Sequence, residues 1–184
     1  MKLTNTEKLQ LLQIARTVIR KHLSHGKDTV NDFYEPEGML NASCGAFVSL
    51  YIKGKLRGCM GTFSESDPLY KNTQRMALAA ASSDQRFKSI GKEELAELDI
   101  EISVLSPRER IYNPDDIILG KHGIYIVKEG HRGTLLPQVA LDQNWNVEEF
   151  LGHCSKYKAG LEWEEWQSAE IYTYEATVFK SIDD

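Results

Sequence analysis

The N-terminal part of the chain has the periodicity of an amphipathic helix. Apolar residues recur there at three- and four-residue steps, which places them on one helical face. Thr4 and Glu7 have the spacing of a capping box, in which a hydroxyl and a carboxylate satisfy backbone N–H groups at the helix start. Gly26 is the expected stop. The apolar face of this predicted helix consists of Leu11, Leu12, Ala15, Val18, Ile19 and Leu23.

Further along, the apolar pattern changes to the period of two that is typical of strands. Between Ala46 and Ile52, small and aliphatic residues alternate with more polar or aromatic ones, and Lys53–Lys55 supplies a tight turn into a returning strand. A similar alternation places Asp99, Glu101 and Ser103 on one face of a later strand. The predicted strands are 46–52, 56–61, 98–104, 124–127, 134–136 and 170–179, with 128–133 joining the second hairpin.

Three further segments are predicted to be helical. Ser66-Asp67-Pro68 begins a helix that ends at Asp84–Phe87, and Lys92–Glu97 forms a short one. Asn146 caps a helix that carries Val147, Phe150, Leu151 and Cys154, with Gly160 past its end. Residues 27–44 are polar and loop-like. Because helices and hairpins are interspersed without βαβ alternation, we expect an α+β fold with a mainly antiparallel or mixed sheet and flanking helices. No linker divides the chain, which predicts a single domain over residues 1–184.

The composition narrows the class of protein. The chain has 184 residues, of which 41% are hydrophobic and 27% charged, as in ordinary globular proteins. Its 22 basic and 27 acidic residues give a net charge of −5, which argues against nucleic-acid binding. Three cysteines do not form a disulfide framework, and no signal peptide or membrane segment is present. We therefore expect a cytoplasmic protein with reduced thiols.

Gly58-Cys59-Met60-Gly61 is the most informative segment for chemistry. Strand alternation would place Arg57 and Cys59 on one face, and Leu56, Gly58 and Met60 on the other. A guanidinium beside the thiol would favour the thiolate, which attacks electrophiles or binds metals. Flanking glycines would let a ligand or another backbone approach closely. The alternative is that Cys59 is a small buried hydrophobe and the glycines serve tight packing.

Other polar residues form weaker candidates. His122 lies in a glycine-bracketed turn, where it could act as an acid, a base or a ligand, or only bond nearby backbone. Glu101 could partner Cys59 or His122, although exposed strand carboxylates are common. Arg86 and Arg132 lie at breaks between elements and could bind a carboxylate or phosphate, or simply be solvated.

Metal and nucleotide motifs are absent from the sequence. It has no CxxC pair, HExxH, GxxxxGK[ST], GxGxxG or CxxxCxxC run. His22 and His25 are three residues apart at a helix end, but no third ligand is close to them. Trp145, Trp163 and Trp166 lack interleaved basic residues and resemble core or interface aromatics. The sequence therefore predicts no metal site and does not identify a cofactor.

Five ordered segments together resemble the signature motifs of the AMMECR family. Residues 56–63 resemble its LRGCIGTF signature, 84–87 its D-x-RF motif and 120–123 its G-K/V-HG turn. Residues 135–140, followed by Trp145, resemble its LLPQVA…W segment, and 158–161 its KAGL. Met60 stands where the family usually has Ile, and Lys88-Ser89 replace prolines after the D-x-RF motif. The matches cover the chain from about residue 44 to residue 179.

The resemblance implies a fold and partners but no established reaction. It implies one α+β unit with two unequal lobes around a cleft, near which the signature residues cluster. Prokaryotic members resemble the first component of a three-part set, the AmmeMemoRadiSam system, alongside a Memo-like protein and a radical-SAM enzyme. Gln138 joins the substrate-binding candidates through the LLPQVA segment.

Two functional hypotheses follow. In the first, the protein is an enzyme or enzyme component acting on a small molecule. Cys59 is then the nucleophile and His122 the general acid or base, while Arg57 stabilises the thiolate and binds anions. In the second, the protein is a non-catalytic module that binds a ligand or a partner protein in the same cleft, and Cys59 only packs. The substrate-binding candidates in either case are Arg57, Gly58, Gly61, Arg86, Arg132 and Gln138.

Overall fold

The computed structural model describes residues 3–25 and 37–181 as two compact units. The larger unit contains the chain up to Leu105 and returns from Thr177, and the smaller unit comprises Ser106–Ala176. Most of the predicted loop over residues 27–44 lies outside the described residues. Its described end contains the 3₁₀-helix η1, Gly38–Asn41. Each unit has its own sheet and its own hydrophobic core.

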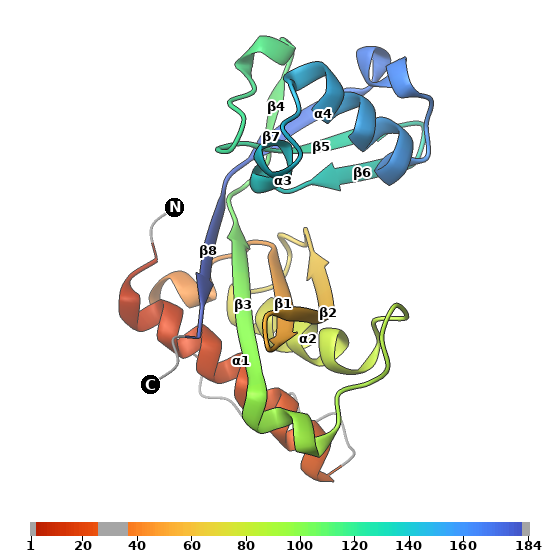
Figure 1. The fold of residues 1–184 in the computed structure, drawn as a ribbon. Helices are drawn as coiled ribbons and strands as arrows, with labels where there is room; N and C mark the ends of the chain where they lie inside the picture. Colours follow the sequence, from red (N-terminus) through yellow and green to blue (C-terminus); the bar gives the residue numbers. More distant parts are fainter. Residues whose placement is uncertain (1–2, 26–36, 182–184) are drawn as a thin grey trace. The chain divides into compact units, whose positions relative to one another are not determined.

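The larger unit is a four-stranded sheet with two helices packed on one face (Figure 1). Its strand order is β2-β1-β3-β8, so β2 lies at one edge. Alternate residues of β1 and β3, including Val48, Leu50 and Ile102, are buried beneath the helices. The elements are α1 (Asn5–His25), β1 (Ala46–Ile52), β2 (Lys55–Thr62), α2 (Leu69–Ser82), the 3₁₀-helix η2 (Lys92–Glu97), β3 (Leu98–Leu105) and β8 (Ala176–Lys180).

The start of α1 confirms the predicted capping box. The Glu7 N–H donates to Thr4 Oγ1 over 3.2 Å, and the Thr4 N–H donates to Glu7 Oε2 over 2.8 Å. A hydroxyl and a carboxylate thus satisfy N–H groups that have no partner within the helix. The predicted apolar face is buried, with Leu11, Ala15 and Ile19 fully inaccessible.

The smaller unit is a second four-stranded sheet in the order β4-β7-β5-β6 (Figure 1). Phe150 and Leu151 of α4 are fully buried in its core with Ile124 and Ile126 of β5. Asn146 caps α4 as predicted, because its Oδ1 accepts from the Glu149 N–H over 2.9 Å. The elements are β4 (Glu109–Ile111), η3 (Pro114–Asp116), β5 (Gly123–Lys128), β6 (His131–Leu135), α3 (Pro137–Asp142), α4 (Val147–Cys154), the π-helical turn η4 (Ser155–Ala159), η5 (Trp163–Ser168) and β7 (Glu170–Tyr174).

The structure corrects the sequence interpretation in three places. The strand predicted over 170–179 is two strands in different sheets, β7 and β8, separated at Glu175. The Glu175 backbone bonds Ser106 instead of a neighbouring strand. The Glu175 N–H donates to Ser106 Oγ over 2.9 Å, and the Ser106 N–H donates to the Glu175 carbonyl over 2.9 Å. The second hairpin turns within Glu129–Gly130, at φ values of 50° and 87°, rather than over six residues. The short elements β4 and α3 were not predicted.

The sheets and their flanking helices confirm the predicted α+β class. Both are antiparallel in the pairs β1–β2, β1–β3, β4–β7, β5–β6 and β5–β7. Within the described residues, no helix is both long enough and apolar enough to cross a bilayer.

We predict that the protein unfolds in a single thermal transition. The chain passes between the units twice through short connections, from β3 to β4 and from β7 to β8. Unfolding of either unit therefore frees strand ends of the other, which couples the two. Differential scanning calorimetry should give one peak with equal calorimetric and van't Hoff enthalpies, whereas two separated peaks would contradict the single-domain prediction.

Candidate functional site

A β-bulge at Arg57 changes which side chains share a face with Cys59. Cys59 pairs with Ser49 and Gly58 with Leu50, but the next pair is Leu56 with Tyr51, which leaves Arg57 as the extra residue. Residues directly opposite each other project to the same face of a sheet. Ser49 and Tyr51 are two residues apart on β1 and share a face, so their partners Cys59 and Leu56 share that face too. The predicted simple alternation, which put Leu56 on the opposite face from Cys59, is therefore wrong.

The Arg57 side chain binds the segment between α2 and η2. Its Nε and Nη2 donate to the two carboxylate oxygens of Glu94 over 2.8 and 3.1 Å. Nη1 donates to the Lys88 carbonyl, and Nη2 also donates to that of Ser89 over 3.2 Å. The hydrogen bonds from Arg57 hold the pKa of Glu94 below its usual value. None of these bonds goes to the Cys59 sulfur, so they fasten β2 to residues 88–94, and a direct role at the thiol stays a prediction.

Cys59 lies in a polar row on the sheet face opposite to α1 and α2. Ser49 pairs with Cys59 on one side and with Glu101 on the other, which gives a row across β2, β1 and β3. The Ser49 hydroxyl donates to the Cys59 Sγ over 3.3 Å. Two strand spacings separate Cys59 from Glu101 by about 10 Å, so Ser49 stands between the thiol and the carboxylate.

Glu101 is bound by two neighbours. The Tyr51 hydroxyl donates to its Oε1 over 3.3 Å, and the Lys180 ammonium lies 3.6 Å from its Oε2. Burial, together with the Glu101 charge, raises the pKa of Tyr51. The carboxylate is only 16% exposed and is held on the same face as the thiol.

Asp84 and Arg86 clamp the backbone of Cys59 at the free edge of β2. The Cys59 N–H donates to Asp84 Oδ2 over 2.9 Å, and the Cys59 carbonyl accepts from Arg86 Nη2 over 3.2 Å. Arg86 also binds Asp84 in a fork, through Nε to Oδ1 at 2.9 Å and Nη2 to Oδ2 at 2.8 Å. The pair thus bonds the backbone groups that a neighbouring strand would otherwise bond.

The electrostatics of this clamp favour its charged form. Asp84 is only 5% exposed, and the side-chain hydrogen bond from Arg86 holds its pKa far below the ordinary value of 3.8. Bonding to Asp84 raises the pKa of Arg86, and attraction to the Cys59 thiolate adds to that rise. The guanidinium that binds Cys59 is therefore that of Arg86, which donates to the Cys59 carbonyl over 3.2 Å.

The other two cysteines are buried. Burial raises the pKa of Cys44 to about 11 and that of Cys154 to about 12. Cys59 is partly exposed, and all three thiols are free. The structure therefore distinguishes Cys59 from both other thiols.

The two glycines beside Cys59 are explained by packing. Gly58 is buried, and a Cβ there would collide with the Ala80 carbonyl of α2. A Cβ at Gly61 would collide with the Phe47 ring. These contacts match the tight-packing interpretation, while a substrate-binding role for either glycine stays a prediction.

His122, Arg132 and Gln138 belong to the smaller unit. The Ile118 N–H donates to His122 Nδ1 over 3.2 Å, which places the proton of the neutral imidazole on Nε2. Arg132 is exposed on β6, and Gln138 is partly exposed in the first turn of α3. The structure brings Cys59 and Arg86 together within the larger unit. His122, Arg132 and Gln138 are part of the smaller unit, which is described by itself.

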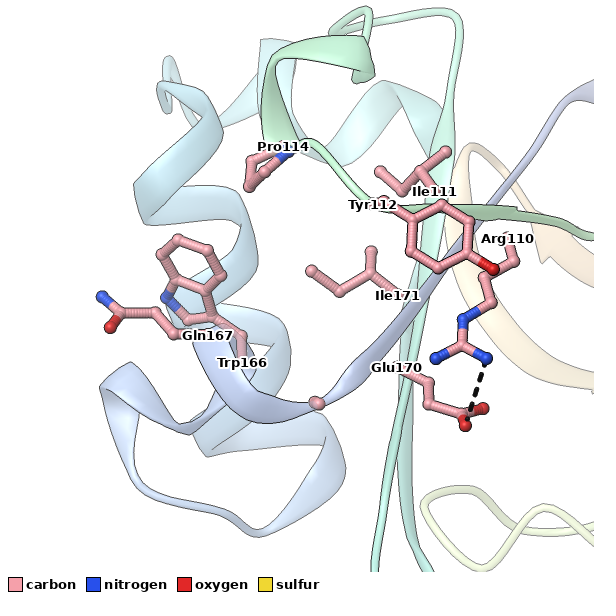
Figure 2. A pocket seen from close by; sticks show the side chains of 9 residues that line it. Arg110, Ile111, Tyr112, Pro114, Trp166, Gln167, Glu170 and Ile171 are labelled. Carbon is pink, nitrogen blue, oxygen red and sulfur yellow. Dashed lines mark ion pairs between the residues drawn. The ribbon is translucent and has the colours of Figure 1, made fainter.

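The smaller unit also contains a pocket that sequence reasoning missed. Its volume is about 140 Å³, and Ile111 and Ile171 lie in its wall (Figure 2). An ion pair of 3.4 Å joins Arg110 to Glu170 at one side. None of the candidate residues lines it. The lining residues are Arg110, Ile111, Tyr112, Pro114, Trp166, Gln167, Ala169, Glu170 and Ile171.

Sequence reasoning also passed over Ser49, Tyr51 and Asp84. The first two occupy the polar positions of the predicted strand 46–52, and Asp84 opens the D-x-RF motif. The alternation of Ser49 and Tyr51 with core residues could have predicted that both lie on the polar face of the strand. In the described part of the chain, no three His, Cys, Asp or Glu residues are grouped to hold a metal ion.

Comparisons with known proteins identify the family. A profile of the AMMECR1 family matches residues 12–179. Protein NEQ441 of Nanoarchaeum equitans is 36% identical over 182 residues, which cover 94% of this chain and 99% of the relative. Protein MJ0810 of Methanocaldococcus jannaschii is 35% identical over 98% of this chain and 93% of the relative.

A solved structure agrees with this result. The crystal structure of the uncharacterised protein PH0010 from Pyrococcus horikoshii matches with a TM-score of 0.81 and 32% identity, over 94% of this chain and 90% of that one. The chain belongs to the AMMECR1 family. The family resemblance found in the sequence motifs is thereby confirmed.

We predict that Asp84→Asn destabilises the protein by about 2 kcal/mol at pH 7, because it weakens buried charge-assisted hydrogen bonds. The folded-state pKa of Asp84 is depressed, so its contribution is present above about pH 4 and is lost as the pH falls further. Urea unfolding at pH 7 and pH 3 should therefore show a smaller difference between variant and wild type at pH 3.

Asp67→Asn is the matched control, since Asp67 forms an exposed ion pair with Arg75. It should cost less than about 1 kcal/mol at either pH. Equal losses for the two variants at pH 7 would argue against the clamp.

Proposed function

We propose that the protein is a cysteine-dependent enzyme, or a component of one, that acts on a small molecule through Cys59. The Cys59 sulfur attacks an electrophilic carbon, the C–S bond forms, and the leaving group departs with its bonding electron pair. The thiol proton passes to a base or to water. The observation that carries the proposal is the setting of Cys59, a partly exposed residue whose sulfur accepts from the Ser49 hydroxyl and whose carbonyl accepts from the Arg86 guanidinium.

The fixed backbone at Cys59 supports the proposal. Asp84 and Arg86 hold both the N–H and the carbonyl of this one residue, so its Cα position is strongly restrained. A nucleophile must be held in place to react efficiently. A thiol that only fills space does not require a charged pair at its backbone.

Ser49 and Glu101 follow Cys59 in the polar row across the sheet. The Ser49 hydroxyl contacts the sulfur, and Glu101 pairs with Ser49 in the adjacent strand. We propose Glu101 as the group that accepts the proton through Ser49 or an intervening water. The general acid or base role of His122 stays a prediction.

The proposal extends to the proteins with which this one acts. We propose that the protein is the first component of an AmmeMemoRadiSam set and acts with a Memo-like protein and a radical-SAM enzyme. The five motifs in family order support this, as does the full-length match to archaeal relatives.

One observation favours the alternative, a non-catalytic module that binds a ligand or protein. Arg57, Gly58 and Gly61 all have packing or internal bonding roles that require no reaction. In that case Cys59 is a packing residue of the same face. Its chemical reactivity separates the two functions.

We predict that iodoacetamide modifies Cys59 in the native protein more than about ten times faster than Cys44 or Cys154 at pH 8. At that pH, a thiol with a pKa of about 11, such as Cys44, is ionised only about one part in a thousand. Peptide mass spectrometry after timed quenching gives the three rates in one sample.

Cys44 and Cys154 serve as internal controls, and Cys59→Ser should remove the fast phase. All three thiols should become modifiable after denaturation without reductant, since none is in a disulfide. If Cys59 stays unmodified until denaturation, the enzyme proposal fails and the binding module takes its place.

A second prediction tests the partners. The chain, mixed with the Memo-like protein and the radical-SAM enzyme of the same organism, should elute earlier in size-exclusion chromatography than any of the three alone. Three unchanged elution volumes at concentrations of about 10 µM would contradict the partner assignment.

A further inference from the structure

The Arg86 guanidinium is held by Asp84 and the Cys59 carbonyl and lies 5.4 Å from the centre of the Phe87 ring, yet most of the side chain is exposed. All of its hydrogen bonds to oxygen use Nε and Nη2, which donate to Asp84 and to the Cys59 carbonyl. Within residues 3–25 and 37–181, Nη1 donates no hydrogen bond to an oxygen atom. The side chain is 61% exposed, whereas Asp84 behind it is 5% exposed. Asp84 therefore fixes the fork, while Nη1 has no oxygen partner among the described residues.

The other charges near Cys59 are less available. Arg57 is 22% exposed and is bound by Glu94 and two carbonyls. Glu101 is 16% exposed and is held by Tyr51 and Lys180. Asp84 has its oxygens turned to the Arg86 fork and the Cys59 N–H. Arg86 is thus the charged group at Cys59 that combines exposure with free donors.

An anionic group on Nη1 would lie close to Cys59, because the same guanidinium binds the Cys59 carbonyl. The guanidinium bonds the Cys59 carbonyl and interacts with the Cys59 side chain as well. A planar guanidinium recognises carboxylate and phosphate oxygens through paired N–H groups. Because one guanidinium would bind both Cys59 and the anion, the spacer between the anion and the electrophilic carbon must be short.

From this geometry we infer that the substrate of Cys59 is a small carboxylate or phosphate compound whose electrophilic carbon lies close to its anionic group. This inference rests on the proposed function and assigns its substrate class. Arg86 binds the anion and positions Cys59, and Asp84 orients Arg86.

The test compares iodoacetate with iodoacetamide, two reagents of nearly equal size that differ in charge. In each reaction the sulfur forms a bond to carbon, iodide leaves with the bonding electron pair, and the thiol proton goes to solvent. The measured quantity is the iodoacetate to iodoacetamide rate ratio at Cys59, divided by the same ratio for glutathione. Because both rates scale with the reactivity of the thiol, this ratio isolates the recognition of charge.

We expect a normalised ratio of about five or more for the wild type. Arg86→Gln should return it to about one, and Arg86→Lys should fall between. Arg75→Gln is the matched control, because Arg75 is a 52% exposed arginine that is also paired with an aspartate, and its ratio should stay that of the wild type.

Inorganic phosphate supplies a test that needs no substitution. At millimolar concentration it should slow alkylation of wild-type Cys59 by iodoacetate more than by iodoacetamide, with sodium chloride at equal ionic strength as the reference. This measurement holds even if Arg86→Gln fails to fold.

The outcomes separate the two proposals. If neither reagent modifies native Cys59, the proposed function fails. If both react with a normalised ratio near one and phosphate gives no protection, Cys59 remains a nucleophile and the anionic substrate class is overturned.

Discussion

The candidate site depends on the ion pair between Asp84 and Arg86. Cys59 lies on β2, an edge strand whose outward N–H and C=O groups have no neighbouring strand to bond. Asp84 accepts from that N–H and Arg86 donates to that carbonyl, so two side chains take the place of a strand. At Cys59, the backbone groups of this edge are therefore not available for pairing with another chain. The same two bonds fix the residue that carries the thiol.

This arrangement has a stability role, and in the proposed function it has a chemical one as well. Burial of Asp84 would be costly without Arg86, since an unpaired carboxylate loses its hydration. Arg86 neutralises it with a fork of two hydrogen bonds and stays 61% exposed. Its charge therefore balances that of the buried aspartate, and in the proposed function it also acts on the sulfur of Cys59. Arg57 completes the attachment of the 84–94 segment through Glu94 and two backbone carbonyls.

The polar row across the sheet follows from strand register. Ser49 stands opposite Cys59 and Glu101 because β1 is paired on both sides without a shift at that position. The bulge one pair further along releases Arg57 from the alternation and turns it toward Glu94. Because of this one-residue bulge, Arg57 bonds the loop that contains Glu94, while Cys59 lies on the polar face of the sheet.

The sequence by itself determined the local elements. Periodicity and caps located α1, β1, β3 and α4, because burial of one face and satisfaction of helix ends depend on residues close in the chain. The five motifs also identified the family and pointed to Cys59, His122, Arg57 and Arg86. The separation of residues 170–179 into two sheets was decided by pairing with distant strands, which no local pattern records.

The tertiary structure decided which arginine accompanies the thiol. Alternation predicted Arg57, since it is two residues from Cys59, but a bulge is a property of the pairing with β1 and not of β2 alone. Arg86 reaches Cys59 from 27 residues away, because Asp84 and the turn after α2 place it at the edge of the sheet. Contacts between segments far apart in the chain depend on register and packing, and only the folded chain fixes these.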